Sequence, residues 1–234
     1  MVTSATSPRT GAHRRGSRAP ALLAVAVDVV IFTVTAEGLA VLLARRQREP
    51  FAGRWTLPGS FLRDDESPEA GAARVLRDRV GIGEVYIEQL YTFGRPERDP
   101  RGRVLSVGFF ALMPWNRAET VARAALGTAW HQVAGMPVPG FDHAEIIGMA
   151  HDRLAGKLEY STIALQLMPE RFTLSQLQAV YEAILGEALD KRNFRKRIRA
   201  FDCIEPTGET YRAGKHRPAR LYRLKRPGEV RIIK

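Results

Sequence analysis

Residues 59–82 read GSFLRDDESPEAGAARVLRDRVGI, and this segment has the pattern of a turn followed by a helix. Ser67 is a favourable N-cap, Pro68 suits the first helical position, and Glu69 places a negative charge at the positive end of the helix dipole. Apolar residues then recur at helical spacing. The segment therefore predicts an amphipathic helix over about Pro68–Val80.

The predicted helix brings positions 75, 78 and 79 onto one face, because residues three and four apart on a helix are neighbours. Three carboxylates there would make a platform for Mg²⁺, a hard cation that prefers oxygen ligands and can activate water. The chain instead carries Val75, Asp78 and Arg79. Valine offers no ligand, and Arg79 puts a permanent positive charge where the cation would sit. Arg79 could itself donate to an anion such as a diphosphate, which would then be bound and not cleaved, so we expect no metal site on this face.

The segment resembles the box of the Nudix hydrolases, which cleave nucleoside diphosphates linked to another group. That box has a glycine, a loop with a glutamate, and then Arg-Glu-apolar-x-Glu-Glu-x-Gly-apolar. Here the loop glutamate, Glu66, comes one residue late and the three helical glutamates are missing. An ordinary amphipathic helix would explain the helix alone, but the approach to it, Arg54–Phe61, also resembles the strand and turn before the box. The positions of the degenerate box are Gly59, Arg74, Val75, Asp78, Arg79 and Gly81.

Several segments around the box have the β-branched and aromatic composition of strands. The strands cover about Leu22–Val34, Leu39–Arg45, Gly83–Phe93 and Val104–Met113. A further helix opens at a capping-box match, Asp142 to Glu145, and runs to about Lys157. With the box helix, these elements predict an α/β (α+β) fold, a Nudix-type mixed sheet sandwiched by helices. The intervening segment Trp115–Pro139 fits neither pattern.

A polar loop, Gly94–Gly102, joins two of the predicted strands. In Nudix proteins similar to this one, the corresponding loop borders the ligand pocket, so its arginines would supply cations for a phosphate. For any single arginine, a solvated loop with incidental charge is the simpler interpretation. The effector-binding residues that the resemblance implies are Arg54, Trp55, Glu66, Arg79, Arg98, Arg101 and Arg103.

The C-terminal part of the chain predicts a helix-turn-helix followed by a wing. Thr173 to Gln176 is a capping-box match that opens an amphipathic helix, which Gly186 ends. Asp190 caps a second helix, and its apolar stripe leaves the basic side chains facing outward. A helix, a short turn and a helix match the helix-turn-helix, whose second helix enters the major groove. Two short strands around a basic loop then form the predicted wing.

Basic and amide side chains of the second helix are the candidates for reading DNA. Asn193 can pair with adenine and Arg192 with guanine edges. The alternative is a solvated basic helix that binds polyanions without sequence preference. The predicted DNA contacts are Lys191, Arg192, Asn193, Arg195, Lys196 and Arg199 on the helix and Lys215, His216 and Arg217 on the wing.

Charge is concentrated at the two ends of the chain, which carries +11 over 234 residues. Residues 1–20 hold four arginines and no acid, and residues 190–234 hold fifteen lysines and arginines against five acids. A near-neutral body with basic ends favours a specific polyanion-binding module. The single cysteine, Cys203, excludes an intrachain disulfide and fits a reducing compartment. No uninterrupted apolar stretch is long enough to span a bilayer, so we expect no membrane association and a cytoplasmic, nucleoid-associated location.

The order of these segments resembles the Nudix-related transcriptional regulators of NAD metabolism, the NrtR family, over about residues 20–230. The resemblance implies a homodimeric repressor of NAD biosynthesis or salvage genes that reads a palindromic operator. It also implies an effector, ADP-ribose or a related nucleotide, with no required cofactor. The expected organisation is a disordered basic tail (1–19), a Nudix-like effector-binding and dimerisation domain (20–160), a linker (161–171) and a winged-helix DNA-binding domain (172–234).

Two other interpretations remain open at this point. The first is an active ADP-ribose or nucleoside-diphosphate pyrophosphohydrolase with an appended nucleic-acid-binding domain, because Glu66 and Asp78 are retained and Asp65 or Glu69 could substitute as ligands. The second is a nucleotide-binding module whose basic end binds RNA or membrane. Salt-dependent binding without sequence preference would support the second.

Overall fold

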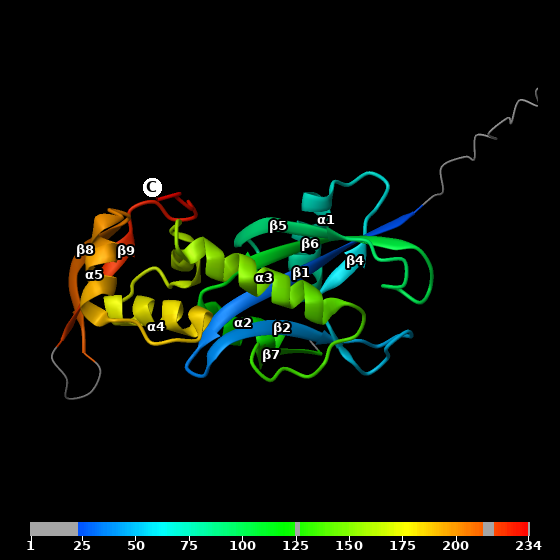
Figure 1. Ribbon diagram of the computed structural model, residues 1–234, viewed down its shortest axis with the longest axis horizontal. Helices are drawn as coiled ribbons and strands as arrows, with labels where there is room; N and C mark the ends of the chain where they lie inside the picture. The colour runs from blue at the N-terminus through cyan, green and yellow to red at the C-terminus, as the bar shows by residue number, and fades with distance from the viewer. Residues whose placement is uncertain (1–22, 125–126, 213–217, 234) are drawn as a thin grey trace, which may run out of the picture.

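The computed structural model describes residues 23–124, 127–212 and 218–233, with the Nudix-like sheet at one end and the winged helix at the other (Figure 1). In chain order the elements are β1 Ala24–Thr35, β2 Gly38–Arg45, β3 Trp55–Thr56, β4 Gly59–Phe61, α1 Pro68–Val75, the π-helical turn η1 Leu76–Val80, β5 Tyr86–Phe93, β6 Val104–Leu112, α2 Trp115–Ala124, β7 Thr128–Gln132, α3 His143–Leu158, the 3-10 turn η2 Ile163–Leu167, α4 Leu174–Leu185, α5 Lys191–Ala200, β8 Ile204–Tyr211 and β9 Ala219–Leu224. None of the helices in the described ranges has the length and apolar composition needed to span a bilayer.

The seven-stranded sheet is mixed, as predicted, with the order β3-β2-β1-β6-β5 and with β4 paired to β1 and β7 to β2. The central strand β1 is parallel to β6 and antiparallel to β2 and β4. Its side chains alternate between two cores, because successive residues of a strand point to opposite faces. Val29 and Ile31 pack with α1 and α2, whereas Val30 and Phe32 pack with α3 and α4. A strand buried on both faces explains the continuous apolar run.

The box helix begins and ends where the sequence predicts. The Ser67 side chain caps α1 by accepting a hydrogen bond from the Ala70 amide at 3.2 Å. The helix continues through η1 as one π-helical turn to Val80. Gly81 then ends it with φ 71°, a left-handed conformation that glycine adopts without steric strain.

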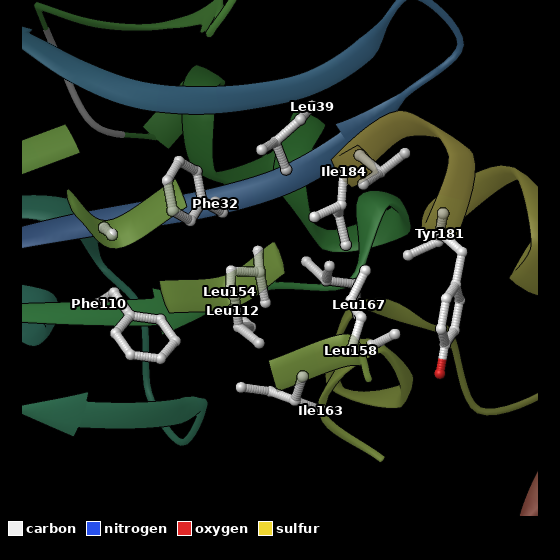
Figure 2. Packing of buried hydrophobic residues seen from close by; sticks show 14 of the residues in the cluster. Phe32, Leu39, Phe110, Leu112, Leu154, Leu158, Ile163, Leu167, Tyr181 and Ile184 are labelled. Atoms are coloured by element: carbon white, nitrogen blue, oxygen red, sulfur yellow. The ribbon is translucent and has the colours of Figure 1, made fainter. Parts of the chain in front are cut away.

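The core between the sheet and α3 continues into the winged helix. Figure 2 shows Phe32 and Leu112 from the sheet, Leu154 and Leu158 from α3, and Tyr181 and Ile184 from α4 around the same buried core. The connector 161–171 is part of it, because Ile163, Ala164, Leu165 and Leu167 of η2 are buried. The two parts of the chain therefore share one hydrophobic core.

The predicted helix-turn-helix and wing are present. Thr173 and Gln176 form both reciprocal bonds of the capping box at the start of α4. The turn before α5 is held by Glu182, which accepts from the Leu189 amide at 2.9 Å, and Asp190 caps α5 by accepting from the Asn193 amide at 2.8 Å. Strands β8 and β9 form the antiparallel wing.

Two expectations need correction. Trp115–Pro139, which fitted no pattern, contains α2 and β7, and β7 pairs with β2 at the side of the sheet. The capping-box prediction at Asp142 is wrong: Asp142 stands at the N-cap of α3 but its side chain makes no capping bond. Its carboxylate accepts two hydrogen bonds from Arg98 instead, and a charge-assisted pair of this kind is stronger than a single cap.

Candidate effector site and nucleic-acid interface

An ion pair between Arg74 and Glu66 holds the loop of the box against its helix. Arg74 Nε donates to Glu66 Oε2 at 2.9 Å, and its Nη2 donates to the Phe61 carbonyl at 3.1 Å. The same carboxylate accepts from the Arg63 amide at 2.9 Å. Hydrogen bonding from Arg74, with a further bond from Arg63, lowers the pKa of Glu66 to about 2. Glu66, predicted to contact the effector, is therefore engaged in fixing the loop.

The helix face that would hold a metal does not fit one. Val75 is 1% exposed and packs in the core, while Asp78 pairs with its neighbour Arg77 at 3.0 Å and Arg79 is exposed. Across residues 23–124, 127–212 and 218–233, no three His, Cys, Asp or Glu side chains gather as a divalent cation would require. A dication beside Arg79 would also meet a fixed positive charge.

A buried ionic cluster lies where β1, the 94–102 loop and the start of α3 meet. Arg98, 7% exposed, donates to Asp142 at 2.9 and 2.8 Å and to Asp28 at 3.3 Å. Ser106 Oγ donates to Asp28 at 2.6 Å. A buried guanidinium shared by two carboxylates is stable only because its charge is matched. Arg98, predicted to contact the effector, is thus committed to holding three elements together.

His143 completes this cluster. Its Nδ1 accepts a hydrogen bond from the Leu57 amide at 2.8 Å, and its Nε2 lies 3.6 Å from Asp28 Oδ1. Burial lowers the pKa of His143, so the neutral ring with its proton on Nε2 satisfies both neighbours. The cluster also explains the box glycine: a Cβ on Gly59 would lie 2.3 Å from Asp28 Oδ1 and 2.7 Å from the Val27 carbonyl.

Arginine and aromatic side chains gather beside this cluster, where the Phe141 ring centre lies 5.2 Å from that of His143. We call Arg46, Arg54, Arg101, Phe51, Phe61 and Phe141 the arginine–aromatic rim. The Arg46 guanidinium lies 5.0 Å from the Phe141 ring centre, and Arg101 lies 5.2 Å from that of Phe61 and 5.8 Å from that of Phe141. Arg54 lies 5.8 Å from the Phe51 ring centre. Burial and then the positive charge of Arg101 lower the pKa of Arg46. Arg101 already pairs with Asp99, through Nε at 2.9 Å and Nη2 at 2.6 Å, so an anion in the rim would chiefly offset the burial of the Arg46 charge.

The backbone of the rim is strained at two aromatic residues. Phe51 has φ 68° and Phe141 has φ 58°, and their rings meet edge to face with centres 4.7 Å apart. A bulky residue at positive φ costs about 1–3 kcal/mol and persists where the surrounding structure demands it, often at binding sites. Flat rings beside guanidinium groups can bind a base and a diphosphate together.

The structure brings together only part of the predicted effector set. Arg54 and Arg101 lie in the rim, and Trp55 is half-buried with its ring 4.6 Å from that of His131. Arg103 is exposed and donates to the Gly94 carbonyl, and Arg79 is exposed on the box helix. Sequence reasoning missed Arg46, Phe51, Phe61 and Phe141. The positive φ angles of Phe51 and Phe141 depend on the three-dimensional structure and leave no periodic pattern in the sequence.

The outward face of α5 is basic as predicted. Lys191, Arg192, Asn193, Lys196 and Arg199 are exposed, while Phe194 and Ile198 are buried against α4. Arg195 is half-buried, and its Nε has no hydrogen-bond partner among the described residues. The wing-tip residues Lys215, His216 and Arg217 lie outside the described residues, so their contacts stay predictions.

A Nudix-type sheet with an altered box, sharing its core with a winged helix, defines a Nudix-related protein with a DNA-reading fold. The chain matches the models for the NUDIX domain over residues 22–144 and for the NrtR DNA-binding winged helix domain over residues 164–224. This chain belongs to the NrtR family of Nudix-related regulators.

Two relatives, one of them with two solved structures, agree with this assignment. The ADPR responsive transcriptional repressor NtrR of Acinetobacter baylyi is 37% identical over 203 residues, which cover 85% of this chain and 80% of the relative. The crystal structure of Shewanella oneidensis NrtR complexed with a 27mer DNA has a TM-score of 0.78 at 37% identity, over 86% of this chain and 93% of the other. The NUDIX domain of the same Shewanella protein complexed with ADP ribose has a TM-score of 0.51 at 35% identity, over 60% and 94% of the chains.

Proposed function

We propose that this chain is a transcriptional repressor of NAD biosynthesis or salvage genes whose operator binding is weakened by ADP-ribose or a related nucleotide. The observation that carries the proposal is one continuous core that joins the winged helix to the Nudix-type sheet, together with the rim of arginine and aromatic side chains. The function of the 37% identical repressor and the DNA and ADP ribose complexes of the Shewanella relative support it. The assigned units are the predicted ones, residues 20–160 for the effector and 172–234 for DNA.

The arginine–aromatic rim is the effector site in this proposal. Arg46, Arg54 and Arg101 offer charge-assisted hydrogen bonds to a diphosphate, and the phenylalanine rings offer a flat apolar surface to the adenine. Of the three, Arg46 is the one whose pKa is lowered, chiefly by burial, and an anion would offset that cost. No cofactor is needed for binding of this kind.

In this proposal the site binds its nucleotide without cleaving it. The metal-binding face of the box carries a buried valine and an exposed arginine, Glu66 is engaged by Arg74, and Asp78 pairs with Arg77. The competing function, a pyrophosphohydrolase, requires a carboxylate set that these contacts do not offer. We place the protein in the cytoplasm on the nucleoid, where a repressor meets its operators.

A homodimer fits this function, because a symmetric pair of winged helices reads two half-sites of a palindrome. The centres of such half-sites lie about 10 base pairs, or a multiple of that, apart. A titration of the purified protein against a palindromic fragment and a half-site fragment, with complex mass measured by light scattering, tests this point. A single protomer on the palindrome would contradict it.

The function is tested by a fluorescence anisotropy titration of the full chain. The probes are promoter fragments of NAD-synthesis genes from its own genome and a scrambled fragment of equal length, each with and without ADP-ribose. We expect tighter binding to a promoter than to the scrambled fragment, and weaker binding when ADP-ribose is added. Equal affinity for both fragments would contradict the repressor function and favour the generic polyanion-binding module.

The hydrolase alternative needs its own measurement. The same preparation is incubated with ADP-ribose and Mg²⁺, and formation of AMP and ribose 5-phosphate is followed by chromatography. We expect ADP-ribose to stay intact over a period in which an active Nudix hydrolase consumes it. Turnover at an ordinary enzymatic rate, on the order of 1 s⁻¹ or more, would favour the hydrolase.

A further inference from the structure

Helix α3 connects the effector side of the molecule with the DNA-reading side. Figure 1 shows α3 running along the sheet toward the winged helix. At its first turn, Asp142 is bound by Arg98 and Glu145 pairs with Arg95, and both arginines belong to the 94–102 loop. The start of α3 is therefore tied to the loop that contributes Arg101 to the rim.

The other end of α3 is tied to the recognition helix α5. Arg197 is the arginine of α5 that was left out of the predicted DNA contacts. Its Nη2 donates to the Leu158 carbonyl at 2.7 Å and to the Glu159 carbonyl at 2.9 Å. These are the last carbonyls of α3, which have no partner within their own helix. A cation there also meets the negative end of the helix dipole.

Further bonds join the second half of α3 and the residues just after it to the winged helix. His151 Nε2 lies 2.8 Å from the Ile184 carbonyl of α4, an arrangement in which the ring nitrogen donates. The Thr162 amide donates to the Arg231 carbonyl at 3.0 Å, and the Ile233 amide donates to the Tyr160 carbonyl. Both helices of the reading unit and its final segment thus contact α3 or the residues just after it.

We propose that Arg197 is a positioning residue, which sets the orientation of the recognition helix by binding the end of α3 and contacts no DNA phosphate. In the same proposal, α3 carries the state of the effector site to that helix. The second part rests on the proposed function, whereas the first part does not require an effector.

The start of α3 is held by two ion pairs of different strength, because the Arg98–Asp142 pair is buried. The Arg95–Glu145 pair is exposed, with 60% and 45% of the side chains accessible, so a competing diphosphate displaces it at small cost. The Arg197 bonds are charge-assisted and directed at two carbonyls from one guanidinium. An effector that draws Arg95 and Arg101 toward its phosphates changes the contacts of the first turn, and the rigid helix passes the shift to Arg197.

The test compares Arg197→Ala and Arg197→Lys with Lys196→Ala, which removes the same charge from the neighbouring, outward position. Operator affinity is measured over a series of salt concentrations, with and without ADP-ribose. The full chain is used, and circular dichroism and thermal unfolding verify that each variant is folded. Arg197→Lys keeps the charge and the stem, so it remains informative if the alanine variant does not fold.

The proposal predicts a different signature for each position. Lys196→Ala should reduce the slope of log affinity against log salt by about one unit and change the affinities with and without ADP-ribose by the same factor. Arg197→Ala should leave the salt slope unchanged. It should lower the ratio of the operator affinity without ADP-ribose to the affinity with ADP-ribose by about fivefold or more, which is within the usual range for coupling between an effector site and a second binding site. Arg197→Lys should fall between wild type and Arg197→Ala, because an ammonium does not reproduce the guanidinium fork.

Three other results would each contradict one part of the proposals. If Arg197→Ala loses a slope unit and Arg197→Lys restores it, Arg197 contacts a phosphate and the positioning role is overturned. If the slope is unchanged but the ratio equals that of wild type, α3 does not carry the signal through Arg197 and the coupling part is overturned. If wild type itself ignores ADP-ribose, the effector assignment of the proposed function fails, and the salt slopes still decide the role of Arg197.

Discussion

Replacing Arg98 with alanine tests whether the buried ionic cluster beside the rim stabilises the fold. Arg98 makes three hydrogen bonds to two carboxylates, at 2.9 and 2.8 Å to Asp142 and 3.3 Å to Asp28. Both acids are buried, with side chains 5% and 10% exposed, so the variant leaves them without a counter-charge. Removing one partner of a buried ion pair costs about 3–5 kcal/mol, and we expect the free energy of unfolding to fall by that amount.

The assay is urea unfolding followed by circular dichroism, with Arg103→Ala as the matched control from the neighbouring segment. Arg103 is exposed and donates to one backbone carbonyl, so its loss should change stability by at most about 0.5 kcal/mol. The reasoning would be refuted if both variants had the same stability. If Arg98→Ala instead kept its stability and lost only ADP-ribose binding, Arg98 would be an effector contact, as the resemblance implies.

Three further outcomes follow from the same contacts. Arg46→Ala should weaken ADP-ribose binding by at least about tenfold while leaving the DNA affinity without effector unchanged, as measured by calorimetry and anisotropy, because charge-assisted bonds are worth about 1.5–3 kcal/mol. Glu66→Gln should lower the midpoint of thermal unfolding above pH 4.5, and the difference from wild type should vanish as the pH falls toward 2. The reason is that the pKa of Glu66 is depressed in the folded protein, so the ionised carboxylate stabilises the fold at high pH and this stabilisation is lost on protonation. Ile184→Ala should lower the free energy of unfolding by about 2–5 kcal/mol. Because Ile184 lies in the core that both units share, the variant should still unfold in a single urea transition, and two separate transitions would contradict this.

The parts that could be predicted from the sequence are those that local chemistry determines. Ser67, Thr173 and Asp190 cap their helices with their own neighbours. The β-branched and aromatic composition of the strands and the helical spacing of apolar residues identified the sheet and the reading helices. The altered box was visible for the same reason, because positions 75, 78 and 79 share a helix face by spacing alone.

The parts that could not be predicted depend on partners that are distant in the chain. Asp142 has a good capping pattern, yet Arg98, 44 residues away, binds it more strongly. The rim joins Arg46, Phe51 and Phe141 from two loops, and nothing in their spacing brings them together. Arg197 looks like one more cation of a basic helix, because the carbonyls that it binds belong to α3.

The proposed regulation requires both an effector site that lacks metal ligands and a core that connects this site to the winged helix. A site that cleaved its nucleotide would convert the effector into products. The fraction of occupied sites would then depend on the rate of cleavage as well as on the effector concentration. In this proposal Val75 and Arg79 offer no metal ligand for cleavage, while the arginines of the rim are the groups that would bind the same diphosphate. Binding at the rim can alter DNA affinity only if the effector prefers one arrangement of the reading helices over another. The shared core extends from Phe32 to Ile184 and includes α3, which bonds to α4 through His151 and to α5 through the Leu158 carbonyl. We expect this packing to transmit that preference, which a flexible linker between independent domains would not.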